Sequence, residues 1–388
     1  MRITEIRELA VPLEGSIANA AVSFDDHDVS LVALVSDRMR GGRPLIGLAF
    51  NSIGRFAQGG ILRARMIPRV LAADPASLLD PATGALDPAA LLRTAMRNEK
   101  PGGHGDRAGA AAAIELAAWD LLAKAADEPA YATIARAHGR APRAAPVEVY
   151  AAGGYYYPRG AGRTLADELR GYRDMGFTAF KMKIGGAPLA DDLRRVESAL
   201  AVAGDGARLA VDANGRFGLE TALACAQALA PFGLRWLEEM GDPLDYALNR
   251  RLVEAYAGPV ATGENLFSTI DVENLLRYGG VRPGHDVVQV DPGLAYGITE
   301  LARILRMLEA LGFDRRQVHP HGGHLVNLHI VTALGLGGCE AYPGVFRPFG
   351  GYSEDCVLGA GTVRAGDAPG FGLERKRELA DAIARITA

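Results

Sequence analysis

Short apolar runs rich in β-branched residues recur through the second half of the chain, and each ends beside a polar side chain. The runs are TAFKMK, RLAVD, LRWLE, PVATGE, DVVQVD, QVHPH and GCE, and the polar residues are Lys183, Asp212, Glu238, Glu264, Asp291, His321 and Glu340. The first six polar residues are 26 to 30 residues apart, which is the length of one strand, one covering helix and two loops. The pattern predicts an α/β fold of the (β/α)₈ barrel type, in which the strand ends meet at one face.

Amphipathic segments typical of helices fill the intervals between these runs. They span residues 164–176, 188–204, 219–233, 249–258, 269–280, 298–312 and 324–338. Several end at glycine, a common residue at helix C-termini. We expect the barrel within residues 144–345, with its first strand in PVEVYAAGGYYY at 146–157.

The first part of the chain has a different pattern. Alternating segments at 3–13, 27–37 and 44–52 predict a strand meander, with the pair Gly41-Gly42 as its tightest turn. Helices are expected at 59–73, 88–97 and 107–126, and the last is alanine-rich, which favours helix most strongly. We therefore expect a separate α+β domain at 1–143. A segment at 346–388 should return over that domain and end in a helix at 374–387.

Composition narrows the function classes. Lys+Arg 42 against Asp+Glu 46 gives a net charge of −4 without a block of like charge, so we expect no nucleic-acid partner. No apolar run approaches the ~20 residues of a membrane helix, and the N-terminus lacks the apolar core of a signal peptide. The three cysteines have no CxxC spacing, as in a reducing compartment. We expect a cytoplasmic enzyme.

Three carboxylates follow successive predicted strands and are candidates for a metal site. Asp212, Glu238 and Glu264 offer oxygen ligands without a cysteine or a histidine pair among them, a set that favours a hard cation such as Mg²⁺. Burying three like charges together without a cation would be very costly. The alternative is that Asp212 is a turn residue and Glu238 belongs to a charged loop.

Lys181 and Lys183 lie two residues apart, so on a strand both side chains point to the same face. Two neighbouring ammonium groups should depress each other's pKa, which would leave one able to accept a proton near neutral pH. The alternative is a solvated pair on a strand edge, although a parallel barrel strand has no solvated face.

His321 and Asp291 end adjacent predicted strands, where an aspartate can orient a histidine for acid or base catalysis. The alternative is a zinc site, because His319, His321 and His324 are clustered in the sequence HPHGGH. A zinc site would make the protein a zinc-dependent hydrolase. The neighbouring strand ends offer only carboxylates, which favours the acid role.

The motifs KMK, VDANG, WLEE, ATGEN and HPHGGH resemble the enolase superfamily, in its mandelate racemase and muconate-lactonizing branch, and the resemblance covers essentially the whole chain. Within that branch the stretches FNSIGRFAQGG, NEKPGGHGDR, YAAGGYYYP, FKMKIGGAP, EEMGDPLDYAL, ATGENLFS and PHGGH are most similar to the tartrate dehydratases. One departure is Met240, where the superfamily commonly has proline after the two glutamates. It leaves the predicted ligand Glu238 in place.

The resemblance implies roles for the candidate residues. Asp212, Glu238 and Glu264 would bind one Mg²⁺ per subunit, Lys183 with Lys181 would be the base, and His321 with Asp291 the acid. Asn19, Asn51, Lys100, Tyr155 and Glu340 would surround the substrate, with Lys100 on a glycine-rich loop that could close over it. The domain at 1–143 would be a capping domain, and the enzyme would be a homo-oligomer acting on a small acid sugar.

The reaction that the resemblance implies is Mg²⁺-dependent dehydration of a hydroxy-dicarboxylic acid, D-tartrate to oxaloacetate and water. A base removes the proton next to the carboxylate, and an acid protonates the departing hydroxyl. Racemisation or epimerisation stays open, because Lys183 and His321 could supply bases on both faces of the carbon. Dehydration of a different acid sugar, zinc-dependent hydrolysis and a catalytically silent binding role also stay open.

Overall fold

The computed structural model describes residues 1–15, 17–156 and 164–388, so Tyr157 of the expected first barrel strand lies outside the described residues. The chain opens with an antiparallel sheet of β1 (Ile3–Pro12), β2 (Asp28–Arg40) and β3 (Arg43–Phe50). Gly41 and Gly42 turn β2 into β3 with φ of 58° and 78°, a backbone region that glycine adopts without strain. The strand meander predicted from the alternation is therefore confirmed.

Helical segments follow this sheet along the chain. They are α1 (Gly59–Ile61), η1 (Leu62–Met66), α2 (Ile67–Leu71), η2 (Pro75–Leu78), α3 (Pro88–Ala95), α4 (Asp106–Ala126) and α5 (Ala130–Ala137). The long helix α4 lies on β2 and β3. Gly47 of β3 allows this approach, because a Cβ there would be 2.2 Å from the carbonyl oxygen of Ala117. The short helix α5 was not predicted. It follows the end of α4, where Asp127 has a left-handed backbone conformation, and begins directly after Pro129.

The barrel begins at β4 (Val147–Gly153). Parallel pairing then runs in chain order through β5 (Phe180–Lys183), β6 (Leu209–Asp212), β7 (Leu237–Glu238), β8 (Val260–Thr262) and β9 (Val287–Val288). The segment at Val318 bridges Val288 on one side and accepts a hydrogen bond from the amide of Gly337 on the other. β10 (Cys339–Ala341) pairs with β4 and closes the ring. The predicted barrel fold is confirmed, although the strand expected before His321 forms only this bridge.

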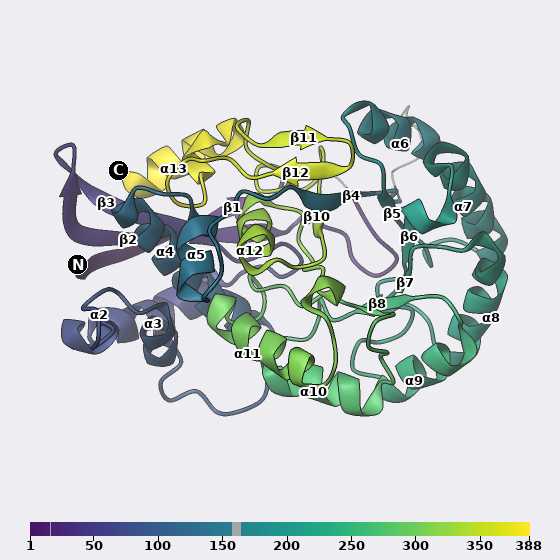
Figure 1. Ribbon diagram of the computed structural model, residues 1–388, viewed down its shortest axis with the longest axis horizontal. Coiled ribbons are helices and arrows are strands. Elements are labelled where there is room, and N and C mark those ends of the chain that lie inside the picture. Colours follow the sequence, from purple (N-terminus) through teal and green to yellow (C-terminus); the bar gives the residue numbers. More distant parts are fainter. Residues whose placement is uncertain (16, 157–163) are drawn as a thin grey trace.

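Helices surround the strands as an arc in Figure 1. They are α6 (Leu165–Asp174), α7 (Leu189–Ala203), α8 (Leu219–Leu229), α9 (Tyr246–Ala255), α10 (Thr269–Tyr278), α11 (Gly297–Ala310) and α12 (Leu325–Leu334). Each leads the chain from the end of one strand to the start of the next. The ends of the strands, which carry the predicted polar residues, therefore lie at one face of the barrel.

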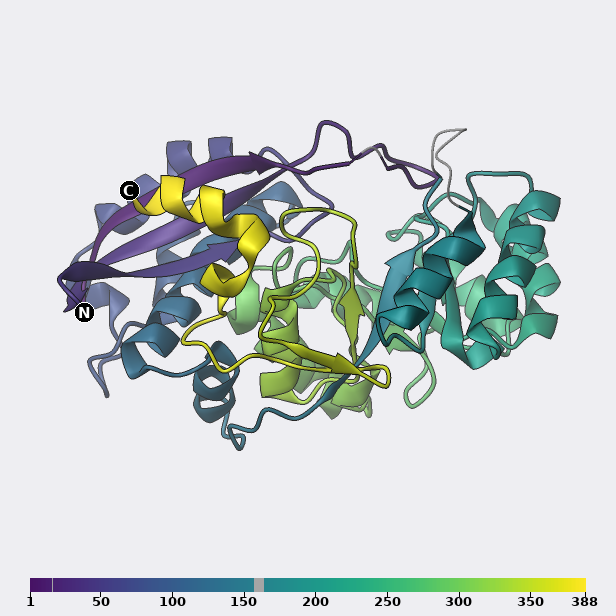
Figure 2. The same cartoon turned by 90° about the horizontal axis from the view of Figure 1, so that it is seen from above.

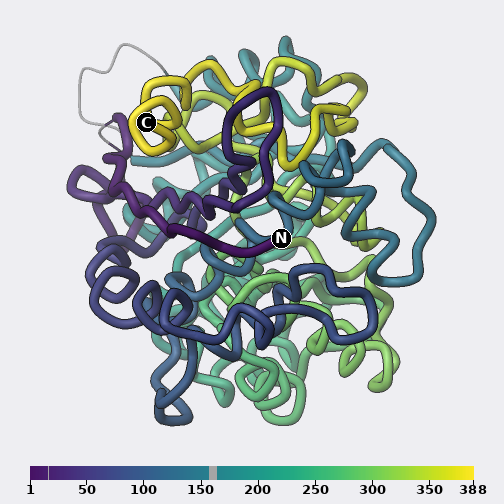
Figure 3. Tube along the Cα trace, turned by 90° about the vertical axis from the view of Figure 1, so that its left-hand side faces the viewer, coloured from purple at the N-terminus to yellow at the C-terminus, as the bar shows by residue number. Residues whose placement is uncertain are grey.

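After β10 the chain forms a small hairpin, β11 (Val357–Gly359) and β12 (Thr362–Arg364), and β12 pairs antiparallel with β4. It then passes through η6 (Leu373–Arg375) and η7 (Arg377–Leu379) into α13 (Ala380–Thr387), which packs on β1 and β2. Figures 2 and 3 show this yellow end of the chain beside the purple N-terminal sheet. The C-terminal segment thus joins both parts of the molecule, while the exact domain limits stay predictions.

None of the helices in the described part of the chain combines the length and the apolar character needed to cross a membrane.

Candidate active site

A cavity of about 120 Å³ lies at the barrel face where the strands end. Its lining comes from barrel loops and from two loops of the N-terminal part, around residues 19–24 and 53–54. The lining residues are Asn19, Ala21, Val22, Phe24, Ile53, Gly54, Tyr155, Lys183, Asn214, Glu239, Glu264, Asn265, His321, Tyr342 and Phe346. The predicted Asn19, Tyr155, Lys183, Glu264 and His321 are thus brought to one space.

Asp212, Glu238 and Glu264 come together beside this cavity, and Glu264 is the one of the three that lines it. Each offers one carboxylate oxygen, and these oxygens lie within 4.8 Å of one another. Asp212 and Glu238 are fully buried, and Oε2 of Glu264 is buried without a hydrogen-bond donor. Within residues 1–15, 17–156 and 164–388 this is the one group of acidic, histidine and cysteine side chains that could hold a metal ion. An all-oxygen donor set of this kind fits Mg²⁺.

The electrostatics of the three carboxylates differ. Burial raises the pKa of Glu238 to about 8 despite the ammonium group of Lys181, and Asp212 and Glu264 add to the rise. Burial would also raise the pKa of Asp212, but Lys183 and Lys181 hold it well below its usual value. Carboxyl groups outnumber cationic groups here, so a divalent cation would relieve repulsion among them.

Both lysines of the KMK motif lie against these carboxylates. Nζ of Lys183 is 2.5 Å from Oδ2 of Asp212, and Nζ of Lys181 is 2.5 Å from Oε1 of Glu238 and 2.7 Å from Oε1 of Glu340. The prediction that one of the two lysines would be left able to accept a proton near neutral pH is wrong for this arrangement. Burial and mutual repulsion act to lower the pKa, but the adjacent carboxylates outweigh them and raise both pKa values.

His321 lies between two polar partners. Its Nδ1 is 3.1 Å from Oδ2 of Asp291, and its Nε2 is 3.1 Å from the hydroxyl oxygen of Tyr342. Burial would lower the pKa of His321, but the charges of Glu264, Asp291 and Glu340 together with the Asp291 hydrogen bond raise it to about 9. The predicted pairing of Asp291 with His321 is present.

The other two histidines of HPHGGH face elsewhere. Nε2 of His324 lies 2.9 Å from the hydroxyl oxygen of Ser52. His319 packs between the rings of Tyr150 and Trp236 inside the barrel. Burial lowers the pKa of each to about 4, so both are neutral. They do not form a metal group with His321, and the arrangement required by the zinc alternative is absent from the described residues.

Three of the predicted substrate contacts do not line this cavity. Asn51 is buried, and its side chain already has partners within the protein. Its amide oxygen accepts a hydrogen bond from the backbone amide of Ser30, and its Nδ2 donates to the carbonyl groups of Ser52 and Arg55. Glu340 is buried, and Lys181 lies against one of its carboxylate oxygens.

Lys100 is the third. It is exposed and lines a separate cavity of about 330 Å³ together with residues of α11 and of the loop before α4. Its glycine-flanked loop does not bring it over the active-site cavity in this structure.

Several lining residues were not predicted. Asn214, Glu239 and Asn265 follow the predicted ligands within two residues, and this position alone could have marked them. Nδ2 of Asn265 donates to both carboxylate oxygens of Glu239, at 3.1 and 3.0 Å. Tyr342 and Phe346 come from the loop after β10, where no pattern in the sequence identifies them.

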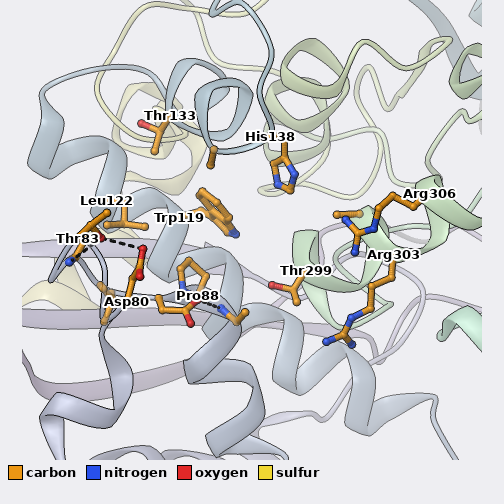
Figure 4. Close-up of a pocket in the computed structure, with 16 residues that line it drawn as sticks. Asp80, Thr83, Pro88, Trp119, Leu122, Thr133, His138, Thr299, Arg303 and Arg306 are labelled. Atoms are coloured by element: carbon orange, nitrogen blue, oxygen red, sulfur yellow. Dashed lines mark hydrogen bonds between the residues drawn. The ribbon is translucent and has the colours of Figure 1, made fainter.

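A second, larger cavity of about 540 Å³ lies between the N-terminal helices and α11. Figure 4 shows Trp119 and His138 facing Thr299, Arg303 and Arg306 across it. It contains none of the strand-end residues and no group of metal-ligating side chains within the described chain. The smaller cavity is therefore the candidate active site.

Comparison with known proteins identifies clear similarities. Residues 164–379 match the family described as enolase C-terminal domain-like. The chain is 32% identical over 284 residues to a 3,6-anhydro-alpha-L-galactonate cycloisomerase of Streptomyces coelicolor, covering 70% of each protein. It is 31% identical over 225 residues to an arabinonate dehydratase of Saccharolobus solfataricus, but this match spans only 57% of that enzyme.

Solved structures show the same fold. An L-talarate/galactarate dehydratase of Salmonella typhimurium, crystallised with Mg and L-lyxarohydroxamate, superposes with a TM-score of 0.73 at 25% identity over 95% of this chain and 88% of that one. A racemase of Streptomyces coelicolor with bound magnesium superposes with a TM-score of 0.76 at 23% identity over 99% of both chains. The similarity thus includes the N-terminal domain and the barrel together.

Proposed function

The chain belongs to the enolase superfamily, and we propose that it is a Mg²⁺-dependent acid-sugar dehydratase whose substrate is D-tartrate, converted to oxaloacetate and water. The observation that carries the proposal is that Lys183 and His321 line one cavity from separated positions around the ring. Lys183 ends β5, and His321 follows the segment that bridges β9 at Val318. A base and an acid placed in this way can act on neighbouring carbons of one substrate.

Asp212, Glu238 and Glu264 would hold the Mg²⁺. When bound, Mg²⁺ supplies a Lewis acid that stabilises negative charge on the substrate carboxylate and offsets the protein carboxylates that otherwise keep the lysine pKa values high. A talarate/galactarate dehydratase and a racemase of the same fold were crystallised with magnesium, which supports this choice of metal.

The residues of the chain then have distinct tasks. Lys183 accepts the proton from the carbon next to the carboxylate. The bond from the next carbon to its hydroxyl breaks, and that oxygen takes a proton from Nε2 of His321 and leaves as water. Asp291 holds Nδ1 of the same ring, so the imidazole keeps its orientation while it gives up the proton. The resulting enol becomes the keto acid.

The size and lining of the cavity bear on the substrate. A cavity of about 120 Å³ is small compared with the roughly 300 Å³ or more of sites for larger ligands, which favours a four-carbon acid. A second carboxylate needs a cation at the far end. Arg55 is one candidate, since its guanidinium donates to Oδ1 of Asn265 at 3.2 Å and forms no ion pair within the described chain. Lys100 is the other, if its loop moves.

A second candidate is dehydration of a monocarboxylic sugar acid. Asn19, Asn214 and Asn265 line the cavity. An amide side chain can bind the hydroxyl groups of a substrate as readily as it binds a carboxylate of the substrate. The arabinonate dehydratase among the relatives acts on such an acid.

A panel of acids tests the proposal. The enzyme with Mg²⁺ is incubated with D-, L- and meso-tartrate and with five- and six-carbon monocarboxylic sugar acids, and keto-acid formation and deuterium uptake from D₂O are measured. We expect D-tartrate to give the highest kcat/KM and Lys183→Ala to lose both readouts. Preference for a monoacid would contradict the tartrate assignment alone. Deuterium exchange with inversion and without loss of water would contradict dehydration and favour racemisation.

A further inference from the structure

The side chain of Tyr342 touches the atom of His321 that the proposed reaction uses. Its hydroxyl group donates to Oε2 of Glu340 at 3.0 Å, and the oxygen of that group lies 3.1 Å from Nε2 of His321. Tyr342 is buried at 2% exposure and its ring packs against Phe346. The hydroxyl therefore occupies a fixed position between the histidine and the glutamate.

The donors and acceptors of this chain of hydrogen bonds can be assigned from chemistry alone. Glu340 is paired through Oε1 with the ammonium group of Lys181 at 2.7 Å, so it is an ionised carboxylate that only accepts hydrogen bonds. The single proton of the Tyr342 hydroxyl is directed to Oε2 of Glu340. The phenol oxygen can then meet Nε2 of His321 only as an acceptor, and Nε2 must carry a hydrogen.

The other ring nitrogen leads to the same conclusion. Nδ1 of His321 faces Oδ2 of Asp291, whose other oxygen accepts from the amide of Gly293 at 2.8 Å and from Nδ2 of Asn327 at 3.2 Å. Both ring nitrogens thus face acceptors, and the imidazole is arranged to donate from each.

We propose that Tyr342 is a positioning residue that presents His321 to the substrate as a proton donor and so directs the site toward dehydration rather than racemisation. The inference rests on the dehydratase function proposed above. Racemisation would require Nε2 to accept a proton, whereas the arrangement supplies one. When Nε2 passes its proton to the departing hydroxyl, the carbon–oxygen bond breaks and water leaves. The Tyr342 hydroxyl can then turn from Glu340 and donate to the free lone pair of Nε2. Solvent restores the lost proton before the next turnover.

Tyr342→Phe tests this role, because it removes the hydroxyl and keeps the ring that packs on Phe346. We expect the rate of water loss from tartrate to fall about 30-fold, the scale of one hydrogen bond to a charged group. Deuterium exchange at the carbon next to the carboxylate, which depends on Lys183, should stay within about twofold of the wild type. The product ratio of exchanged substrate to keto acid should therefore rise.

Tyr352→Phe is the matched control. The Tyr352 hydroxyl also binds Glu340, but it donates to the backbone carbonyl at 2.8 Å and no contact with His321 accompanies it. This variant should keep the ratio of exchange to water loss. If Tyr342→Phe does not fold, 3-fluorotyrosine at position 342 keeps the ring and the hydroxyl while weakening the oxygen as an acceptor, and should lower water loss without changing exchange.

The outcomes are distinguishable. Water loss by Tyr342→Phe at the wild-type rate, or an equal loss of exchange and dehydration, would overturn the role of Tyr342. A wild-type enzyme that neither exchanges nor dehydrates any acid sugar would overturn the proposed function instead. Dehydration that drops while exchange persists supports both.

Discussion

Asp291→Asn is a sharp test of the acid, because the structure dictates how the new amide must lie. Asp291 is fully buried, and its Oδ1 accepts two hydrogen bonds, from the amide of Gly293 and from Nδ2 of Asn327. In the variant the amide oxygen has to keep those two donors. The new NH₂ group then faces Nδ1 of His321, where the carboxylate oxygen lies now at 3.1 Å. Nδ1 must accept that hydrogen bond, so the imidazole is held neutral.

The expected loss follows from this change. A neutral imidazole that gave up its remaining proton would become an anion, so the acid contribution, worth about 10² to 10⁴ in rate, is largely removed. We expect dehydration of tartrate to slow about a thousandfold, equal to ~4 kcal/mol in activation free energy. Proton abstraction by Lys183 does not use Asp291, so deuterium exchange should persist.

The pH profile gives an independent readout. Because the pKa of His321 is raised to about 9 by Glu264, Asp291 and Glu340 against the effect of burial, the wild type should lose dehydration as the pH rises through about 9, where the acid is deprotonated. Asp291→Asn should lose it at lower pH. Keto-acid formation and deuterium uptake are measured in parallel from about pH 5 to about pH 11, which spans the wild-type transition on both sides.

A suitable control is Asp245→Asn, since Asp245 caps α9 by accepting from the amide of Leu248 and asparagine caps equally well. Dehydration by Asp291→Asn within about tenfold of the wild type, or an equal loss of exchange, would refute the assignment of His321 as the acid.

The metal site, a buried histidine and the far end of the substrate each give a further test. Removal of divalent metal by EDTA should abolish activity, Mg²⁺ should restore it, and Glu238→Gln should raise the Mg²⁺ concentration required; activity that survives chelation would contradict the metal site. His329 is buried, and burial lowers its pKa to about 4. Above about pH 6.5 the neutral side chain costs the folded state nothing, but as the pH falls toward 4 the unfolded chain binds a proton that the folded chain does not, so the free energy of unfolding decreases. At pH 5 the loss amounts to about 2 kcal/mol, and His329→Gln should flatten the acid limb of stability measured by urea denaturation. One of the two variants Arg55→Met and Lys100→Met, the one that removes the partner of the far carboxylate, should lower kcat/KM for tartrate about a hundredfold and leave turnover of a monocarboxylic sugar acid nearly unaffected. Wild-type kinetics with tartrate in both variants would contradict a dicarboxylate substrate.

Much of the site could be predicted because it depends on strand direction. The ends of parallel strands in a ring meet at one face, so Asp212, Glu238 and Glu264 had to come together once their spacing was recognised. The lysine pKa values could not be predicted in the same way. The direction of each pKa shift depends on whether the ammonium group lies nearer to another lysine or to a carboxylate. The distances of 2.5 Å from Lys183 to Asp212 and from Lys181 to Glu238 decide that direction.

Residues on loops were harder to predict than residues on strands. Tyr342 reaches His321 from the loop after β10, and Lys100 lies over a different cavity from the one expected. The path of such a loop is set by packing against distant parts of the chain, which no local pattern records. The hairpin of β11 and β12 was missed for a related reason, since β12 pairs with β4, a strand from the opposite end of the barrel sequence.

Glu340 connects the two catalytic groups, and this predicts a result unlike that of any other variant. One of its oxygens lies 2.7 Å from Nζ of Lys181, and the other accepts from the hydroxyl of Tyr342. Burial alone would raise the pKa of Glu340, but Lys181, His321 and Lys183 hold it below its usual value, so it is a charge shared by the base side and the acid side. Glu340→Gln removes that charge from both. Deuterium exchange and water loss should therefore fall together, by about tenfold or more for each, whereas Asp291→Asn and Tyr342→Phe should affect water loss alone. If Glu340→Gln lowered only one of the two rates, the carboxylate would serve only that side of the site, and the link from Lys181 to His321 would have no role in the reaction.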